Sequence, residues 1–174
     1  MKKRRFLKKY DGLKYGWLNN IKKFLLLLIV LLFIFHSVIG FSFIKGYSMQ
    51  PTLMEGDLVL YIRFNLSYRR GDIVSVKIPS GEYYVKRIIA MEGDTVDLKD
   101  GKVYVNDELI SEPYLNVQLT EPDGGIVRYP YTLQKGQVFI MGDNRSESMD
   151  SRNFGAVGKR QIKGKILFRI SRTF

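Results

Sequence analysis

A serine and a lysine are the residues of this chain that could carry out covalent chemistry. Ser48 lies in the segment GYSMQPTL, directly after a long apolar stretch, and Lys86 lies in the segment YYVKR. The sequence contains no cysteine, and its one histidine, His36, lies inside the apolar stretch. A cysteine nucleophile and a Ser-His-Asp triad are therefore excluded. If Ser48 is a nucleophile, another group must accept its proton, and lysine does so in the Ser-Lys variant of this chemistry.

The residues around Lys86 indicate how a lysine could act as a base. A free lysine has a pKa of about 10.4 and is protonated at neutral pH. On a strand, residues two apart share a face, so Lys86 shares its face with Tyr84, Ile88 and Ala90. Burial in such an apolar row can lower a lysine pKa by about 3 to 5. The alternative is a lysine on an edge strand that extends to water, and periodicity alone favours that alternative.

The positive charge of the chain is concentrated at its N-terminus. The net charge is +11, and residues 1–23 hold nine Lys or Arg against one acid, Asp11. A local basic tail of this kind fits retention in the cytoplasm and contact with anionic lipid. No helix-turn-helix, zinc-ligand spacing or aromatic-basic groove motif is present, so the sequence predicts no nucleic-acid partner.

An uncharged apolar run of 21 residues, 24–44, follows the basic tail. As a helix it would extend about 31 Å, which matches the hydrocarbon core of a bilayer. The alternative is a cleaved signal peptide, but the first alanine is Ala90, so no Ala-x-Ala site follows the run. The pattern predicts one uncleaved transmembrane anchor in the cell (plasma) membrane, with residues 1–23 in the cytoplasm and residues 45–174 outside.

The outer part alternates short β-branched or aromatic runs with Gly, Asp and Pro, which predicts a mainly β domain. No amphipathic helix of a dozen residues is visible in it. Residues 106–136 are rich in Pro and Gly and are predicted to form a loop-rich elaboration of unknown role. The candidate strands are 58–63, 72–78, 82–91, 95–99, 102–105, 126–132, 137–141 and 164–170.

A third segment, GDNRSESMDSRNFG at 142–155, joins the segments of Ser48 and Lys86 as a motif. Together with GYSMQPTL, RRGDIVSVKIPSGEYYVKRIIAMEGD and the anchor, it closely resembles the type I signal peptidases, in the small single-anchor form of Gram-positive bacteria. These are membrane-bound Ser-Lys proteases that remove signal peptides from exported proteins. The resemblance implies a mainly β, antiparallel catalytic fold after one N-terminal transmembrane helix. It also implies secretory preproteins and the lipid bilayer as partners, and no cofactor or metal.

The resemblance assigns roles to individual residues. It implies that Ser48 is the nucleophile, that Lys86 is the general base and that Ser148 hydrogen-bonds and orients Lys86. Asp150 and Arg152 match a charged pair that braces the active-site loop. The chain departs from the pattern of some of these peptidases at Gly46, where they carry a hydroxyl residue that helps to stabilise the oxyanion.

The resemblance also predicts where the substrate binds. An extended signal peptide would pair with the strand that contains Tyr83, Tyr84 and Val85. Shallow apolar pockets would select small residues in a small-x-small (Ala-x-Ala-like) pattern. Their expected members are Ile44, Met49, Leu53, Tyr84 and Val85.

Two other readings of the sequence remain. A soluble self-cleaving repressor of the LexA type shares the Ser-Lys chemistry, but the anchor argues against it. A non-enzymatic membrane-tethered β-domain that binds exported chains is the second alternative.

Overall fold

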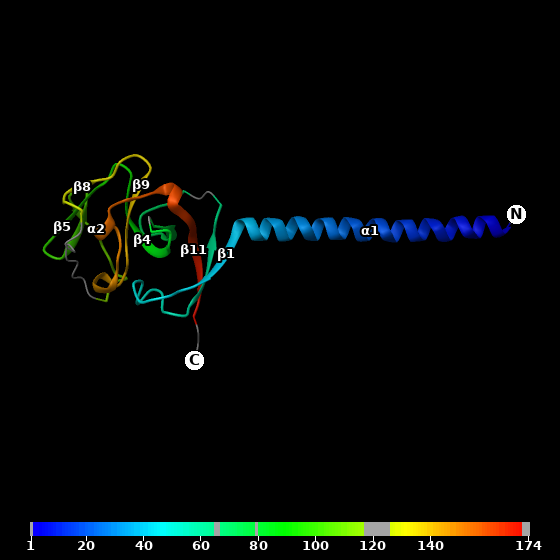
Figure 1. The fold of residues 1–174 in the computed structure, drawn as a ribbon, viewed down its shortest axis with the longest axis horizontal. Coiled ribbons are helices and arrows are strands. Elements are labelled where there is room, and N and C mark those ends of the chain that lie inside the picture. Colours follow the sequence, from blue (N-terminus) through cyan, green and yellow to red (C-terminus); the bar gives the residue numbers. More distant parts are fainter. Residues whose placement is uncertain (1, 65–66, 79, 117–125, 172–174) are drawn as a thin grey trace. The chain divides into compact units, whose positions relative to one another are not determined.

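The chain forms two compact units, Met1–Ile39 and Gly40–Phe174. The computed structural model describes residues 2–64, 67–78, 80–116 and 126–171, and it describes side chains from residue 16 onward. Figure 1 shows the path of the chain from the N-terminus to the C-terminus.

The first unit is the helix α1, Lys2–Val38. Its segment Gly16–Val38 has a mean hydropathy of 2.3 and is long and apolar enough to cross a membrane, and none of it is buried inside the protein. A long, mainly apolar helix with exposed side chains suits a lipid environment.

The helix ends six residues before the predicted apolar run does. Residues Ile39–Phe43 form the strand β1, and Ile44 is buried in the second unit. Gly40 explains part of this difference, because a Cβ at this position would lie 2.3 Å from the ring of Tyr61. Glycine is a weak helix former, and here its small size permits close packing.

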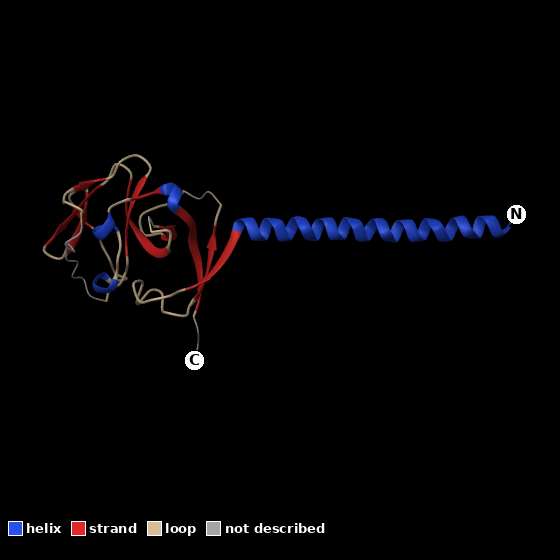
Figure 2. Cartoon of the chain, viewed as in Figure 1, coloured by secondary structure: helices blue, strands red, loops and turns tan. Residues whose placement is uncertain are grey.

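The second unit consists mainly of strands (Figure 2). The strands form one seven-stranded sheet with the order β1-β2-β11-β3-β4-β9-β10 and one four-stranded sheet with the order β7-β6-β5-β8. The ladders from β2 onward are antiparallel, which confirms the predicted fold class. The remaining bounds are β2 Leu58–Ile62, β3 Ile73–Lys77, β4 Tyr83–Met91, β5 Thr95–Lys99, β6 Lys102–Val105, β7 Glu108–Leu109, β8 Tyr131–Thr132, β9 Gln137–Met141, β10 Val157–Gly158 and β11 Ile162–Ile170, with the short helices η1 Arg145–Glu147, α2 Ser151–Phe154 and η2 Lys159–Gln161.

Seven of the eight predicted strands match an observed strand to within two residues at each end. The exception is the predicted strand 126–132, of which only Tyr131–Thr132 is a strand. Pro130 lacks an N–H group for a ladder, so β8 begins after it. The short strands β1, β7 and β10 were not predicted. The two-residue strands β7 and β10 carry too little periodicity to be recognised, and the residues of β1 were included in the predicted apolar anchor, 24–44.

Alternate residues of β4 and β9 enter two different apolar clusters. Ile88 and Ile140 pack in one cluster, and Ile89 and Met141 pack in the other. Ala90 was predicted to share the face of Ile88 but packs in the cluster of Ile89, because the β4–β9 register shifts between Ile88 and Ala90. A bulge of this kind inserts one residue and reverses the alternation beyond it.

The predicted loop-rich elaboration, 106–136, contributes β7 and β8 to the two edges of the four-stranded sheet. Residues 117–125 of this elaboration lie outside the described residues. Residues 110–116 have no regular structure, and Glu112 in this segment contacts Arg145.

Candidate active site

Ser48 lies in the segment between β1 and β2, and this segment is closed and packed. The N–H of Gly56 donates to the carbonyl of Ile44 over 2.9 Å, which ties the two ends together. Met49 and Leu53, each 2% exposed, pack with Ile44 in an apolar cluster. Because the neighbours of Ser48 are anchored in this way, its side chain has a fixed position.

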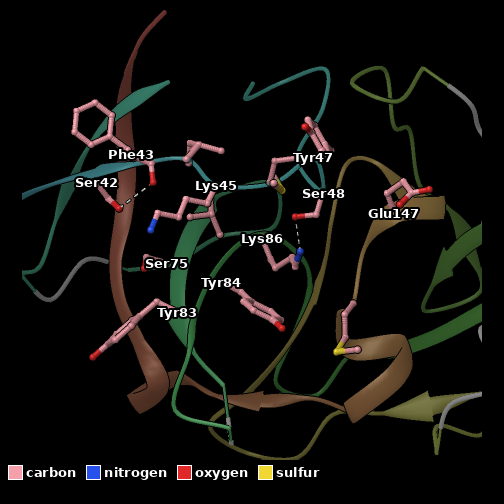
Figure 3. Close-up of a pocket in the computed structure, with 15 residues that line it drawn as sticks. Ser42, Phe43, Lys45, Tyr47, Ser48, Ser75, Tyr83, Tyr84, Lys86 and Glu147 are labelled. Carbon is pink, nitrogen blue, oxygen red and sulfur yellow. Dashed lines mark hydrogen bonds between the residues drawn. The ribbon is translucent and has the colours of Figure 1, made fainter. Parts of the chain in front are cut away.

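Lys86 lies in the middle of the seven-stranded sheet, on β4, where it pairs with Val74 of β3. The residue is only 3% exposed. Its Nζ lies 2.7 Å from Oγ of Ser48, which is hydrogen-bonding distance. Figure 3 shows the two side chains pointing toward each other inside a cleft.

The surroundings of Lys86 favour its neutral form. Burial lowers the pKa of Lys86 from 10.5 to about 8, against the opposing attraction of the Asp150 carboxylate. The same value of about 8 includes two smaller contributions to the pKa of Lys86: the nearby Arg152 guanidinium lowers it, and Asp143 raises it. Desolvation dominates because the ammonium loses its hydration shell in the core. The alternative of a lysine extending to water is therefore wrong.

The loop from Gly142 to Arg152, called the 142–152 loop below, is organised by one buried carboxylate. Asp150 is fully buried and accepts hydrogen bonds from Gly142 N at 2.9 Å, Ser148 Oγ at 2.7 Å and Arg152 Nε at 2.9 Å. Arg152 also donates to two carbonyls of the loop. Every bond satisfies a group that would be costly to bury alone, so the loop has one well-defined shape.

Ser148 is buried near Ser48, but its hydrogen bond differs from the prediction. The sequence predicts a bond to Lys86, whereas the Ser148 hydroxyl donates to Asp150. Among the described residues, the Lys86 ammonium is hydrogen-bonded to Ser48. Gly142 brings the two serines together, because a Cβ there would lie 2.2 Å from Ser148 Oγ and 2.4 Å from the carbonyl oxygen of Ser48. No larger residue fits between them.

A cleft of about 400 Å³ opens beside Ser48 and Lys86. Five of the six predicted substrate-binding residues line this cleft: Ile44, Met49, Tyr83, Tyr84 and Val85. The sixth, Leu53, is not among the lining residues and packs in an apolar cluster with Ile44, Met49 and Val59.

One edge of β4 is open beside the cleft. On one side, Tyr83–Arg87 pair with β3, but on the other side β9 pairs only from Arg87 onward. Within the part of the chain that the structure describes, residues 83–86 thus have no strand on that second edge. A free edge of this kind offers backbone N–H and C=O groups to an extended peptide.

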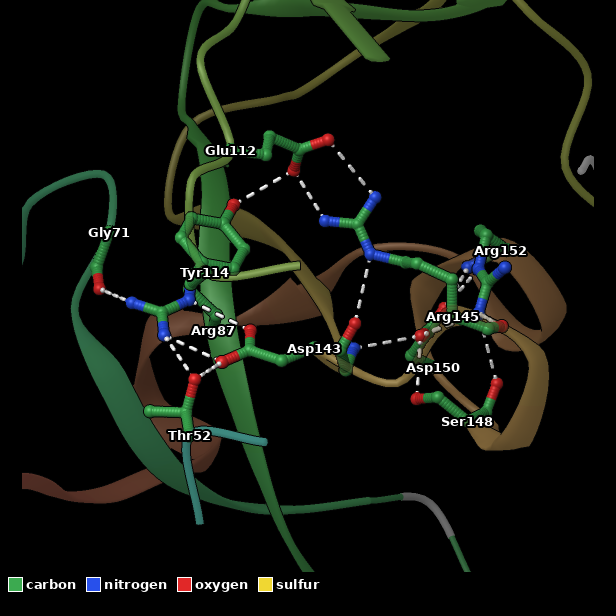
Figure 4. A network of polar contacts seen from close by, with 11 residues as sticks. Thr52, Gly71, Arg87, Glu112, Tyr114, Asp143, Arg145, Ser148, Asp150 and Arg152 are labelled. Atoms are coloured by element: carbon green, nitrogen blue, oxygen red, sulfur yellow. Dashed lines mark hydrogen bonds and ion pairs between the residues drawn. The ribbon is translucent and has the colours of Figure 1, made fainter. Parts of the chain in front are cut away.

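Further charged residues near the site were missed by sequence reasoning, and Figure 4 shows them. Arg87 pairs with Asp143 through two hydrogen bonds of 2.8 and 2.6 Å. Asp143 also accepts from Thr52 Oγ1 at 2.5 Å. Arg145 pairs with Glu112, and both are buried. The available sequence signal was that these charged residues lie next to Lys86 or within the segment 142–155. Their partners could not be identified, because they lie far away in the sequence.

The described residues contain no group of three or more His, Cys, Asp or Glu placed to hold a metal ion.

Comparison with known proteins agrees with this geometry. Residues 17–171 match the family described as "Signal peptidase, peptidase S26". A signal peptidase I of Bacillus licheniformis is 39% identical over 135 residues, covering 72% of this chain and 73% of the relative. A signal peptidase IB of Staphylococcus aureus (strain Mu50) is 35% identical over 157 residues, covering 80% of this chain and 82% of the relative.

A solved structure is also similar. The crystal structure of a signal peptidase I from Enterococcus faecalis V583 superposes with a TM-score of 0.52 at 31% identity, covering 59% of this chain and 98% of that one. With a serine in a cleft, a membrane-anchoring helix and these relatives, the chain belongs to the peptidase S26 family of signal peptidases, serine endopeptidases that remove signal peptides.

Proposed function

We propose that this chain cleaves exported preproteins with Ser48 as nucleophile and Lys86 as general base. The observation that carries the proposal is the 2.7 Å distance between Lys86 Nζ and Ser48 Oγ in a buried setting. A lysine whose pKa is lowered to about 8 is neutral in a useful fraction of molecules near neutral pH. A neutral amine at this distance can accept the hydroxyl proton.

The reaction then proceeds in two stages. Lys86 takes the proton of Ser48 as Oγ attacks the scissile carbonyl carbon, and the C–N bond breaks when Lys86 returns that proton to the leaving amine. The signal peptide is left as an ester on Ser48. Lys86 next deprotonates a water, the resulting hydroxide attacks the ester, and the signal peptide leaves with a free carboxylate while Ser48 regains its proton.

The developing oxyanion needs donors, and the backbone supplies one. Among the described residues, the N–H of Ser48 has no hydrogen-bond acceptor, so it is free to donate to the substrate. Gly46 has no side chain to add a second donor. Its own N–H donates to Glu55 over 3.3 Å, and its φ of +80° is a conformation that favours glycine. A second donor therefore has to come from water or from another backbone amide.

The substrate binds as an extended strand against the free edge of residues 83–86. Ile44, Met49 and Val85 give this end of the cleft an apolar wall that suits small side chains. This arrangement supports selection of a small-x-small site, because alternate residues of an extended peptide face the same wall.

The basic tail and the apolar helix define the orientation of the chain. Under the positive-inside rule, residues 1–23 remain in the cytoplasm and the catalytic unit lies outside. Because the chain has no cysteine, single-cysteine variants can test this. In intact cells, a membrane-impermeant thiol reagent should label Lys102→Cys and not Lys3→Cys, and the reverse result would invert the topology.

The test of the proposed activity is mass spectrometry of a secretory preprotein incubated with the detergent-solubilised full chain. Wild type should make one cut after a small-x-small motif, while Ser48→Ala and Lys86→Ala should make none. Ser42→Ala and Lys45→Ala are matched controls, because both residues line the same cleft and both are exposed. Both controls should cut normally. Normal cutting by Lys86→Ala would refute the proposed base.

A further inference from the structure

Glu112 and Tyr114, in the elaboration for which the sequence suggests no role, contact two arginines that flank the active site. Arg87 directly follows Lys86 on β4, and Arg145 lies in the 142–152 loop. Figure 4 shows Glu112 and Tyr114 between these two arginines. One short segment is thus joined to both halves of the site.

The first contact is a buried ion pair. Both terminal nitrogens of the Arg145 guanidinium donate to the two carboxylate oxygens of Glu112, and the two side chains are 3% and 8% exposed. The Nε of Arg145 donates in turn to the carbonyl of Gly142 over 2.9 Å. Glu112 therefore orients the cation that holds the beginning of the 142–152 loop.

The second contact runs through Tyr114. Its hydroxyl donates to Glu112 Oε1 over 2.8 Å, and its ring lies 3.9 Å from the guanidinium carbon of Arg87. Burial and the neighbouring Glu112 carboxylate raise the pKa of Tyr114, so the phenol remains a donor. The Arg87 guanidinium is then held between the Tyr114 ring and the Asp143 carboxylate.

Strand pairing does not hold the reacting residues together. The β4–β9 ladder ends at the pair Arg87 and Met141. Lys86 precedes Arg87 and Gly142 follows Met141, so both lie one residue past the last paired position. Beyond that position, the Arg87–Asp143 ion pair and the contacts of Glu112 and Tyr114 connect β4 to the 142–152 loop. The N–H of Asn144 in this loop also donates to the carbonyl of Ser48 over 3.0 Å.

We propose that Glu112 and Tyr114 are positioning residues, which clamp Arg87 to Arg145 and so hold Lys86 in register with the 142–152 loop and Ser48. The inference rests on the proposed Ser-Lys mechanism. Misplacement of a reacting group by about 1 Å can cost about 100-fold in rate. Partial loosening of the clamp should therefore lower kcat more than it weakens substrate binding.

The test compares Glu112→Gln and Tyr114→Phe with a matched control in full-length, detergent-solubilised protein. Tyr114→Phe removes only the hydroxyl and leaves the ring on Arg87. The control is Asp97→Asn. Asp97 is buried to a similar degree, since the whole residue is 8% exposed against 9% for the whole residue Glu112. Its ion pair with Lys99 lies in β5, away from the site.

We measure kcat and KM for peptide cleavage, together with the melting temperature. Glu112→Gln should lower kcat about tenfold or more, and Tyr114→Phe about three- to tenfold, with KM within about twofold of wild type. Asp97→Asn should leave kcat unchanged even where it lowers the melting temperature. Equal kcat in all variants, or equal losses in Glu112→Gln and Asp97→Asn, would overturn the inference.

Two further provisions keep the result decisive. If Glu112→Gln does not fold, Tyr114→Phe alone decides, because it removes one oxygen and no charge. If wild type cleaves no peptide, the proposed substrate class fails, and the rate at which a hydroxyl-directed acylating probe labels Ser48 becomes the measurement. Slower labelling in Tyr114→Phe than in Asp97→Asn supports the clamp, and equal labelling refutes it.

Discussion

Replacing Lys86 by methionine should abolish activity and yet make the protein more stable near neutral pH. Methionine has a similar length, carries no charge and suits the apolar row between Tyr84 and Ile88. The folded protein holds the Lys86 cation at a cost, because burial lowers its pKa from 10.5 to about 8. The substitution removes that cost together with the proposed general base.

The size of the effect follows from the pKa values. The difference between 10.5 and about 8 corresponds to about 3 kcal/mol of destabilisation when Lys86 is charged in both the folded and the unfolded chain. Methionine also loses the hydrogen bond to Ser48, worth about 1 kcal/mol. Lys86→Met should thus be about 2 kcal/mol more stable than wild type at about pH 7.

The sign of the pH dependence is fixed by the same values. The cost is fully present below the folded pKa of about 8, where Lys86 is charged in both states. It declines as pH rises above 8 and disappears above the unfolded pKa of 10.5, where Lys86 is neutral in both states. The stability curves of wild type and Lys86→Met should therefore converge and meet at about pH 10.

The assay is chemical denaturation of the full detergent-solubilised chain at several pH values between about 6 and 10, chosen to span the two pKa values. Near-UV circular dichroism of the tyrosines reports mainly on the β unit, because nine of the eleven tyrosines lie in Gly40–Phe174. Lys86→Met with no gain in stability at about pH 7, or with a gain that does not change with pH, would refute the claim that burial depresses the lysine pKa.

Three other changes have expected results. The kcat/KM of wild type should rise with pH to a plateau, with a midpoint at about 8 set by Lys86; a flat profile would argue against a titrating base. Gly142→Ala should eliminate cleavage, because the new Cβ would lie 2.4 Å from the carbonyl oxygen of Ser48; wild-type turnover would contradict this packing. Asp150→Asn should destabilise the fold by about 3 to 5 kcal/mol in denaturation, because it leaves Arg152 buried without a carboxylate; a loss below about 1 kcal/mol would count against this ion pair.

Much of the fold was predictable because the outer unit is made of short, regular strands. The runs 95–99, 102–105 and 137–141 were predicted with the observed bounds, since each contains β-branched or aromatic residues and is followed by turn residues. Ala90 was assigned to the wrong face because a bulge leaves no mark in residue alternation. The end of the anchor was also misplaced, because apolar residues suit both a lipid-facing helix and a buried strand.

The candidate site was predictable in its principal residues and not in its supporting ones. Because the sequence has no cysteine and its one histidine lies in the apolar run, Ser48 and Lys86 were the candidate nucleophile and base. Ser148 was placed near the site, but its hydrogen bond to Asp150 depends on a loop geometry that residue types do not specify. Glu112 was not singled out, since its partner Arg145 lies 33 positions away.

The sequence by itself indicated the apolar helix, the β-rich class and Ser48 and Lys86 as the candidate reacting residues, because these depend on composition and local periodicity. Only the tertiary structure decided that Lys86 is buried against Ser48 with a lowered pKa, and that residues 83–86 have a free edge beside the cleft. A pKa depends on the surrounding dielectric and on charges brought from distant segments. Those surroundings exist only once the strands have paired and the 142–152 loop has brought Asp143, Asp150 and Arg152 near the lysine.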